Sequence, residues 1–251
     1  MKMFEKLLGS FLTHRKEFLC IMILWLTATE VCVCHLSLTR DITNDGVSYL
    51  QMLENAKGMA MLKTHVPPLF LQLVRSTAEV FSASLLSTGI CMNILFFSLT
   101  ICLCFMIVRI ITGKIEPGMW TGALLMLHPF FLSFAHDFLR ESLYLFTVAA
   151  FLLALTCGLR FVSAWGWATA GVFNILAFFT RYEGAELILF VIVGLVIALT
   201  ILKHPPKTVA VFFLAFITGA ACTLTLLATL NISFEFITII QSHMKSHMMA
   251  S

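Results

Sequence analysis

An ionisable cluster follows the first long apolar run of the chain, in the stretch Thr39-Arg40-Asp41-Ile42-Thr43-Asn44-Asp45-Gly46-Val47-Ser48-Tyr49-Leu50. Asp45 and Tyr49 are four residues apart, so on a helix they share one face. A carboxylate such as Asp45, with Arg40 and Asp41 nearby, can act as a general base toward an acceptor hydroxyl or bind a divalent cation. The alternative is structural: Asn44 or Asp45 caps a helix.

A second cluster lies in Lys63-Thr64-His65-Val66-Pro67-Pro68-Leu69-Phe70. The two prolines fix the backbone of a rigid turn, because each ring locks its own φ angle. His65, just before this turn, could form a hydrogen bond with a phosphate or a sugar. The alternative is a histidine that merely lies at the membrane surface.

A third cluster, His136-Asp137-Phe138-Leu139-Arg140-Glu141, holds four ionisable residues between two strongly apolar runs. A charge in the middle of a bilayer costs about 2.5–3.5 kcal/mol, so such residues usually face water or a partner. His136, Asp137, Arg140 and Glu141 are therefore candidates for substrate contacts. A surface ion pair of Arg140 with one of the acids is the alternative.

The fourth cluster is Thr180-Arg181-Tyr182-Glu183-Gly184, at the end of another apolar run. A guanidinium such as that of Arg181 can bind a lipid phosphate through two parallel hydrogen bonds. Its alternative is an interfacial arginine whose aliphatic stem lies along apolar surface. Each cluster is a weak signal by itself, but all four fall on the same predicted side of the membrane.

The elements that position these clusters are apolar helices. Hydrophobic residues make up 60% of the 251 residues and charged residues 12%, with a mean hydropathy of +0.98. These values lie outside the soluble globular range, and a backbone that crosses lipid must satisfy its own hydrogen bonds. We predict an all-α, polytopic membrane protein with a single transmembrane domain over residues 1–251 and no soluble domain. About seven spans are predicted, near 18–36, 84–108, 118–135, 139–158, 164–180, 185–203 and 208–230.

The first predicted loop between spans is long, and we expect it to contain one or two interfacial helices. Asp45–Leu62 is rich in helix formers, and Pro68–Phe81 places Leu69, Leu73 and Val80 on one side. Both helices are expected to lie along the membrane surface.

Loop charges predict the orientation, because cytoplasmic loops are enriched in lysine and arginine. With the N-terminus in the cytoplasm, the cytoplasmic segments carry nine basic and three acidic residues, net +6. The opposite side carries seven basic and ten acidic residues, net −3, and includes all four clusters. We therefore predict an integral multi-pass protein of the plasma (inner) membrane with an extracytoplasmic active face.

Metal and cofactor signals are weak. None of the eight cysteines forms a Cys-x-x-Cys pair, so neither a zinc site nor a disulfide framework is predicted. His243 and His247 are four residues apart, but an unstructured tail is the simpler interpretation. No metal site and no certain cofactor are predicted, although a divalent cation remains possible at the carboxylates. We expect no nucleic-acid partner.

The order of these motifs resembles the GT-C glycosyltransferase superfamily, which includes protein mannosyltransferases and aminoarabinose transferases. Asp45-Gly46-Val47-Ser48-Tyr49-Leu50, followed by His65-Val66-Pro67-Pro68-Leu69-Phe70, is similar to its first outer loop. His128-Pro129 with Leu139-Arg140-Glu141-Ser142-Leu143-Tyr144 resembles its second outer loop, and Thr180-Arg181-Tyr182-Glu183-Gly184 resembles its Arg-x-Glu-Gly corner. Gly46 departs from the pattern, since many relatives carry a second acid there. Relatives also usually have more spans and often a C-terminal soluble domain.

The resemblance implies transfer of a sugar from a polyprenyl-phosphate donor to a lipid, glycan or protein acceptor. The membrane lipids around the protein are further expected partners. It makes Asp45 and Glu141 the expected catalytic carboxylates: Asp45 the general base or acceptor ligand, Glu141 a second acid near the donor or a cation. Arg181, with Arg140 or His65, would bind the phosphate. The remaining expected substrate contacts are Arg40, Asp41, Tyr49, His136, Asp137 and Glu183.

Two other functions fit part of the pattern. A transporter or flippase of lipid-linked sugars is expected to have broken or polar helices in the middle of the membrane, and usually paired repeats in its sequence. The predicted spans are nearly free of charge and show no repeat. A non-catalytic membrane subunit or receptor-like scaffold would leave the four clusters scattered in space, more than about 15 Å apart. A truncated relative of the transferases is a further alternative.

Overall fold

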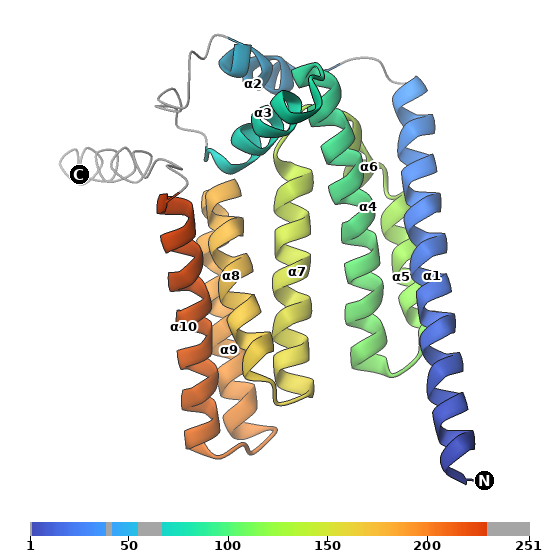
Figure 1. Ribbon diagram of the computed structural model, residues 1–251, viewed down its shortest axis with the longest axis vertical. Helices are drawn as coiled ribbons and strands as arrows, with labels where there is room; N and C mark the ends of the chain where they lie inside the picture. Colours follow the sequence, from blue (N-terminus) through green and yellow to red (C-terminus); the bar gives the residue numbers. More distant parts are fainter. Residues whose placement is uncertain (1, 39–41, 55–66, 230–251) are drawn as a thin grey trace, which may run out of the picture.

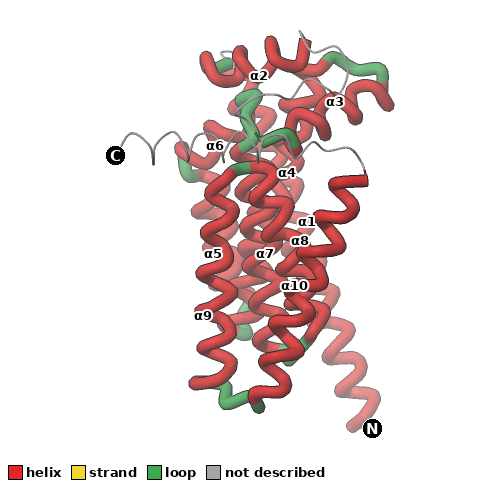
Figure 2. The backbone as a smooth tube through the Cα atoms, turned by 90° about the vertical axis from the view of Figure 1, so that its left-hand side faces the viewer, coloured by secondary structure: helices red, strands yellow, loops and turns green. Residues whose placement is uncertain are grey.

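The computed structural model describes residues 2–38, 42–54 and 67–229, and this part of the chain is built from helices without any strand. Figures 1 and 2 show an elongated bundle with two helices, α2 and α3, lying across one end. We call this the α2–α3 end; it is the upper end in Figure 1. The helical fold class predicted from composition is confirmed.

Five helical segments are long and apolar enough to cross a membrane. They are Arg15–Ser37 within α1 (Lys2–Leu38), α4 (Leu85–Thr112), α7 (Glu141–Arg160), the segment Tyr182–Thr200 made of the 3-10 helix η2 (Tyr182–Glu186) and α9 (Leu187–Thr200), and α10 (Pro206–Thr229). The apolar helix α8 (Ala164–Thr180) has 17 residues and is shorter than these.

The third predicted span is not one continuous helix, which corrects the prediction for 118–135. It consists of α5 (Ile115–Leu127) and α6 (Pro129–His136), bent by 63°. Pro129 cannot continue an α-helix and disfavours the α conformation of His128, which is extended at φ −75° and ψ 117°. The seven predicted spans thus correspond to five full-length spans, one broken pair and one short apolar helix.

The two predicted surface helices lie across the ends of the spanning helices (Figure 1). α3 (Leu69–Phe81) buries Phe70, Leu71 and Val74 and agrees with its predicted range. α2 (Asn44–Glu54) begins one residue earlier than predicted, and the rest of that predicted helix, beyond Glu54, falls outside the described residues.

The sequence suggested Asn44 or Asp45 as the cap of α2, but the side chain that caps this helix is that of Thr43. Thr43 Oγ1 accepts a hydrogen bond from the Gly46 N–H at 3.2 Å. This is the usual N-cap geometry, in which a hydroxyl satisfies a backbone donor of the first turn. The acid in that first turn, Asp45, is left exposed.

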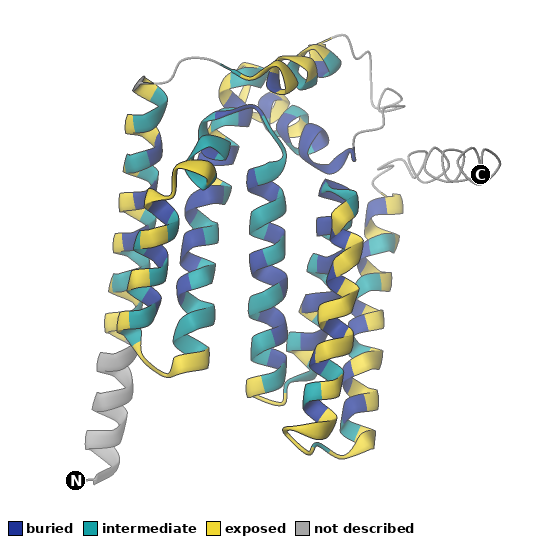
Figure 3. Ribbon diagram, turned by 180° about the vertical axis from the view of Figure 1, so that it is seen from behind, coloured by how far each residue is buried: buried dark blue, intermediate teal, exposed yellow. Residues whose placement is uncertain are grey.

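The surface of the bundle is apolar along the helices, as expected for contact with lipid. α9 and α10 expose Leu189, Phe190, Phe213 and Leu214 by half or more of their surface. Figure 3 shows that exposed and buried positions alternate along the helices of the bundle. Together with the lengths of the helices, this describes a helical membrane protein.

Candidate functional site

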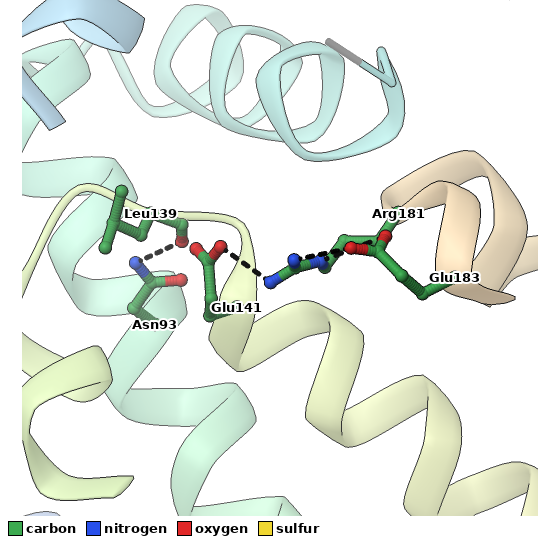
Figure 4. A network of polar contacts seen from close by, with 5 residues as sticks. All are labelled: Asn93, Leu139, Glu141, Arg181 and Glu183. Carbon is green, nitrogen blue, oxygen red and sulfur yellow. Dashed lines mark hydrogen bonds and ion pairs between the residues drawn. The ribbon is translucent and has the colours of Figure 1, made fainter. Parts of the chain in front are cut away.

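The connection between α6 and α7 is held in place by Asn93, a fully buried residue of α4. Its Nδ2 donates hydrogen bonds to the carbonyl oxygens of Asp137, at 2.6 Å, and of Leu139, at 2.8 Å. The second of these bonds is drawn in Figure 4. A buried amide is costly unless it is hydrogen-bonded, so these contacts fix the loop that carries Arg140.

Asp137 joins this loop to the start of α2. Its side chain is 2% exposed, and Oδ2 accepts from Thr43 Oγ1 at 2.5 Å while Oδ1 accepts from the Thr43 N–H at 3.2 Å. Oδ1 also accepts from the Phe138 N–H at 2.8 Å. Asp137 was expected to bind substrate, but in the structure both of its carboxylate oxygens accept hydrogen bonds from the protein.

Gly46 permits this close approach. A Cβ at position 46 would lie 2.5 Å from Asp137 Oδ1 and 2.6 Å from Ile42 Cγ2. A larger residue would push α2 away from the loop, and an acidic one would also place its charge against Asp137. This gives a physical reason for glycine where the resemblance leads one to expect a second acid.

Arg181 is the centre of an ion-pair network at the start of η2 (Figure 4). Its Nη1 lies 3.0 Å from Glu141 Oε1, and its Nη2 and Nε lie 2.7 Å and 3.3 Å from the two oxygens of Glu183. Hydrogen bonding to Glu183 raises the pKa of Arg181; burial opposes this shift, and the negative charges of Glu183 and Glu141 add to it. The guanidinium carbon also lies 5.5 Å from the centre of the Tyr144 ring, within cation–π distance.

The corner that presents Arg181 depends on one hydrogen bond and on one close approach of the backbone. Asn174 of α8 is buried and donates to the Gly184 carbonyl at 3.0 Å. Gly184 is so close to α8 that a Cβ there would lie 2.3 Å from the Phe178 nitrogen. The glycine therefore lets η2 fold back against the end of α8, which sets the direction of Arg181.

Arg140 lies beside Tyr49, with its guanidinium carbon 5.9 Å from the ring centre. Its Nε and Nη1 are buried and have no hydrogen-bond partner in the described part of the chain. The same is true of Glu141 Oε2, the carboxylate oxygen not used by Arg181. Burial raises the pKa of Tyr49, and the positive charge of Arg140 opposes this shift.

The other predicted site residues are placed as follows. Asp45 is exposed on α2, one turn before Tyr49, and contributes to the electrostatic environment of that tyrosine. His136 is half-buried on α6 with its ring 4.6 Å from that of His35 on α1, and its Nδ1 lies 3.3 Å from the Leu132 carbonyl. Arg40, Asp41 and His65 lie outside the described residues.

The structure therefore brings together Tyr49, Arg140, Glu141, Arg181 and Glu183, from α2, the α6–α7 loop, α7 and η2. Sequence reasoning missed Thr43, Asn93, Tyr144 and Asn174 as members or supports of this site. An asparagine inside a strongly apolar helix was the available signal for the two amides.

Metal ligands do not gather in the described ranges, where no group of three histidine, cysteine or acidic side chains could hold an ion. All eight cysteines are free. The arrangement is instead suited to an anion. Arg181 is already paired with two carboxylates, while Arg140 has donors without an acceptor among residues 2–38, 42–54 and 67–229.

In comparisons with known proteins, no family model, no curated protein and no solved structure matches the chain.

Proposed function

We propose that this protein is a membrane glycosyltransferase that moves a sugar from a polyprenyl-phosphate donor to a lipid, glycan or protein acceptor. The observation that carries the proposal is that two buried nitrogens of Arg140 have no hydrogen-bond partner among the described residues, whereas Arg181 already forms ion pairs with two carboxylates. A guanidinium with unpaired donors can bind a phosphate in the bidentate geometry that arginine favours. Because these two nitrogens are buried, the side chains around them would have to move apart to admit the phosphate.

The charge arrangement supports phosphate as a leaving group. Arg181 is balanced by Glu141 and Glu183, so Arg140 is the cation of this cluster without a carboxylate within ion-pair distance in the described chain. As the bond from sugar to phosphate breaks, negative charge grows on the phosphate oxygens. A preorganised cation at that point lowers the barrier, because it stabilises the transition state more than the ground state.

Asp45 and Tyr49 complete the proposed reaction centre from α2. Asp45 would accept the proton of the acceptor hydroxyl, and its exposure leaves it accessible to an acceptor arriving from water. Tyr49 would orient the Arg140 guanidinium through its ring. Glu141 would act mainly through Arg181, which it holds near the phosphate.

The extracytoplasmic location of the site remains part of the proposal. Lys114, Arg160, Lys203 and Lys207 lie in or next to the connections at the end of the bundle opposite α2 and α3. Short basic connections are typical of the cytoplasmic side, which would place the α2–α3 end outside. The site would then receive donors exposed on the outer leaflet of the plasma membrane.

A transporter or flippase of lipid-linked sugars is the second candidate, and one observation favours it. The bend of 63° between α5 and α6 is a discontinuous helix of the kind that transporters use at substrate sites. The bend lies beside His128, which is exposed, rather than at the charged cluster. Transfer chemistry therefore accounts for more of the polar residues.

The test is sugar transfer by purified protein in liposomes, using a set of radiolabelled polyprenyl-phosphate sugars and a lipid acceptor. We expect Arg140→Gln to lower transfer at least about 100-fold, the scale of losing one transition-state contact to charge. Lys203→Gln, at the opposite end of the bundle, is the matched control and should keep full transfer. Movement of the labelled lipid between leaflets, without transfer, would instead support the transporter.

A further inference from the structure

Two histidine rings meet between α1 and α6 at the α2–α3 end. His35 lies in the last turn of α1, and His136 is the last residue of α6. Their ring centres are 4.6 Å apart, and the ring planes are inclined at 48°. The two helices pack against each other beside the rings, where Cys32 and Ala135 are fully buried. Neither histidine has a part in the proposed transfer reaction.

His136 and its neighbour Asp137 hold the two ends of the connection between α1 and α2. His35 contacts His136 from α1, while Thr43, eight residues after His35, donates to Asp137 Oδ2 at 2.5 Å. We call these two contacts the α1–α2 clamp. α2 begins directly after Thr43 and forms one side of the candidate site. A contact broken at one end of the clamp would therefore loosen the chain that positions α2.

The outer end of α1 is the part that such a loosening would move. Of the five spanning helices found among the described residues, α1 buries the smallest share of its residues. The hydroxyls of Thr29 on α1 and Ser98 on α4 lie 3.1 Å apart, within hydrogen-bond distance. Thr29 precedes His35 by six residues, which is about 9 Å along a helix. The last turns of α1 can thus separate from α6 while the helix stays tied to α4 at Thr29.

The contact between the rings suits neutral imidazoles. His136 Nδ1 lies 3.3 Å from the Leu132 carbonyl. A carbonyl can only accept, so Nδ1 carries the proton and Nε2 is the atom that a second proton would bind. Histidine ordinarily gains this proton near about pH 6.5, which makes it sensitive to modest acidification. Two charged rings at 4.6 Å would repel each other, because this distance is shorter than the screening length of about 8 Å in physiological salt.

Other titratable or charged groups come from the elements packed around the two rings. They are Glu30, Cys32 and Cys34 of α1, Cys91 of α4, His128 before α6, and Asp137, Arg140 and Glu141 after it. Glu30 is exposed, Asp137 accepts hydrogen bonds with both carboxylate oxygens, and Glu141 is paired with Arg181. α5 has one charged residue, Glu116, in its first turn at the opposite end of the bundle. Arg40 and Asp41, which follow α1, lie outside the described residues.

We propose that His35 and His136 make the α1–α2 clamp sensitive to protons. The clamp holds α1 against α6 while both rings are neutral, and it releases α1 when both rings are charged. Release moves the outer end of α1 away from the α6–α7 loop and displaces α2, so Tyr49 leaves the guanidinium of Arg140. Sugar transfer would then be high at neutral pH and low in an acidic exterior. This effect on transfer rests on the proposed function, whereas the release of α1 and α2 does not.

Fluorine NMR of the full-length protein in detergent micelles tests the release. The chain has three tyrosines, Tyr49, Tyr144 and Tyr182, and all three lie near the arginines of the candidate site. Fluorotyrosine would replace all of them, and the signal missing from Tyr49→Phe identifies that of Tyr49. Spectra and thermal unfolding are compared at about pH 7.5 and about pH 5.5, on either side of the ordinary histidine value. At the lower pH we expect the Tyr49 signal to move toward that of free fluorotyrosine and the unfolding midpoint to fall by a few degrees.

Three variants separate the charge of the rings from their packing. His35→Phe keeps a ring beside His136 but cannot gain a proton, and a protonated His136 would be attracted by the phenyl face. Its Tyr49 signal should stay in place over the same pH range. His35→Gln removes the ring as well as the charge and should also abolish the pH response. His204→Phe makes the same change at the opposite end of the bundle and should respond as wild type does. A Tyr49 signal that stays in place in wild type, or moves equally in His35→Phe, would overturn the inference.

Sugar transfer at the same two pH values tests the consequence for the reaction. We expect wild type to lose about tenfold at the lower pH and His35→Phe to lose less than about twofold. An equal loss in both proteins would reject control of transfer by the clamp. A pH-dependent Tyr49 signal in a protein that transfers no sugar from any donor would support the clamp and reject the transferase.

Discussion

Glu141 Oε1 and Arg181 Nη1 lie 3.0 Å apart although forty residues separate them in the chain. Glu141 is the first residue of α7, and Arg181 follows the last residue of α8. The ion pair therefore joins the α2–α3 ends of two packed helices. Both side chains are less than a third exposed, so solvent screens this pair less than a surface pair.

This pair also explains why Arg140 and Arg181 differ. Arg181 receives two carboxylates, whereas two of the nitrogens of Arg140 have no acceptor in the described part of the protein. The adjacent residues 140 and 141 thus have different roles. Glu141 holds the guanidinium of Arg181 in place, whereas the guanidinium of Arg140 keeps donors that a ligand could use. We expect substitutions at the two positions to affect different measurements.

Replacing Glu141 tests its positioning role. Glu141→Gln removes the charge but keeps a hydrogen-bond acceptor, and Arg181 retains Glu183. We expect a loss of stability of about 1 kcal/mol, because one partly exposed ion pair is lost. Transfer should fall more than about tenfold while binding of polyprenyl phosphate changes little. Glu79→Gln on α3, which breaks an exposed pair with Arg75, is the control and should leave transfer intact.

Replacing Asp45 tests the proposed general base. Asp45→Asn should lower sugar transfer about 100-fold or more, the usual contribution of a positioned base, without changing expression or membrane insertion. Glu54→Gln places a matched neutral change at an exposed position in the same helix and should retain activity. Full transfer by the Asp45→Asn protein would remove Asp45 from the mechanism.

Much of the architecture could be predicted from the sequence, because a long apolar run has few alternatives to a helix in lipid. The break at His128 was not predicted, although Pro129 carried the information, since prolines are also tolerated within spanning helices. The role of Asp137 was also missed. Its hydrogen-bond partner Thr43, and Gly46 packed against it, are more than ninety residues away in the sequence, and only the folded chain shows that they meet.

The candidate site, too, could be predicted from the sequence only in part. Composition and loop charge singled out Arg140, Glu141 and Arg181 as unusual residues for a membrane protein. Which of the two arginines is already neutralised depends on distances between α7 and η2, and no spacing in the sequence encodes these. The role of Asn93 was not predicted, because a single polar residue in a spanning helix is common. Its role is to hold the α6–α7 loop through hydrogen bonds to two loop carbonyls, which only the structure shows.

Gly46 should tolerate no side chain. In Gly46→Ala the new methyl group would meet Asp137 Oδ1 and Ile42 within 2.6 Å, so α2 must shift away from the α6–α7 loop. We expect a loss of about 1–3 kcal/mol, as for other overpacked sites, measured by thermal unfolding in detergent. Val47→Ala, at the exposed neighbouring position, should cost much less. An unfolding midpoint equal to wild type in Gly46→Ala would contradict the close packing of α2.

Asn93 should be needed for the loop that carries Arg140. Asn93→Leu removes both hydrogen bonds to the loop carbonyls, and we expect a loss of about 2 kcal/mol at about 1 kcal/mol for each bond. Sugar transfer and protection of the loop amides against hydrogen exchange should both fall. Ser98→Ala removes a buried hydroxyl from the same helix, facing α1, and should leave loop protection unchanged.

Alkaline pH should destabilise the protein through Tyr49. Burial raises its pKa in the folded state above the ordinary value of 10.0, so the folded protein holds this proton more tightly than the unfolded chain. The resulting stabilisation is fully present below pH 10.0 and is lost as the pH rises through the folded pKa. Tyr49→Phe keeps a ring beside Arg140 but cannot ionise. Its thermal midpoint should therefore fall less steeply above pH 10.0 than that of wild type, and identical slopes would show that the Tyr49 hydroxyl makes no such contribution.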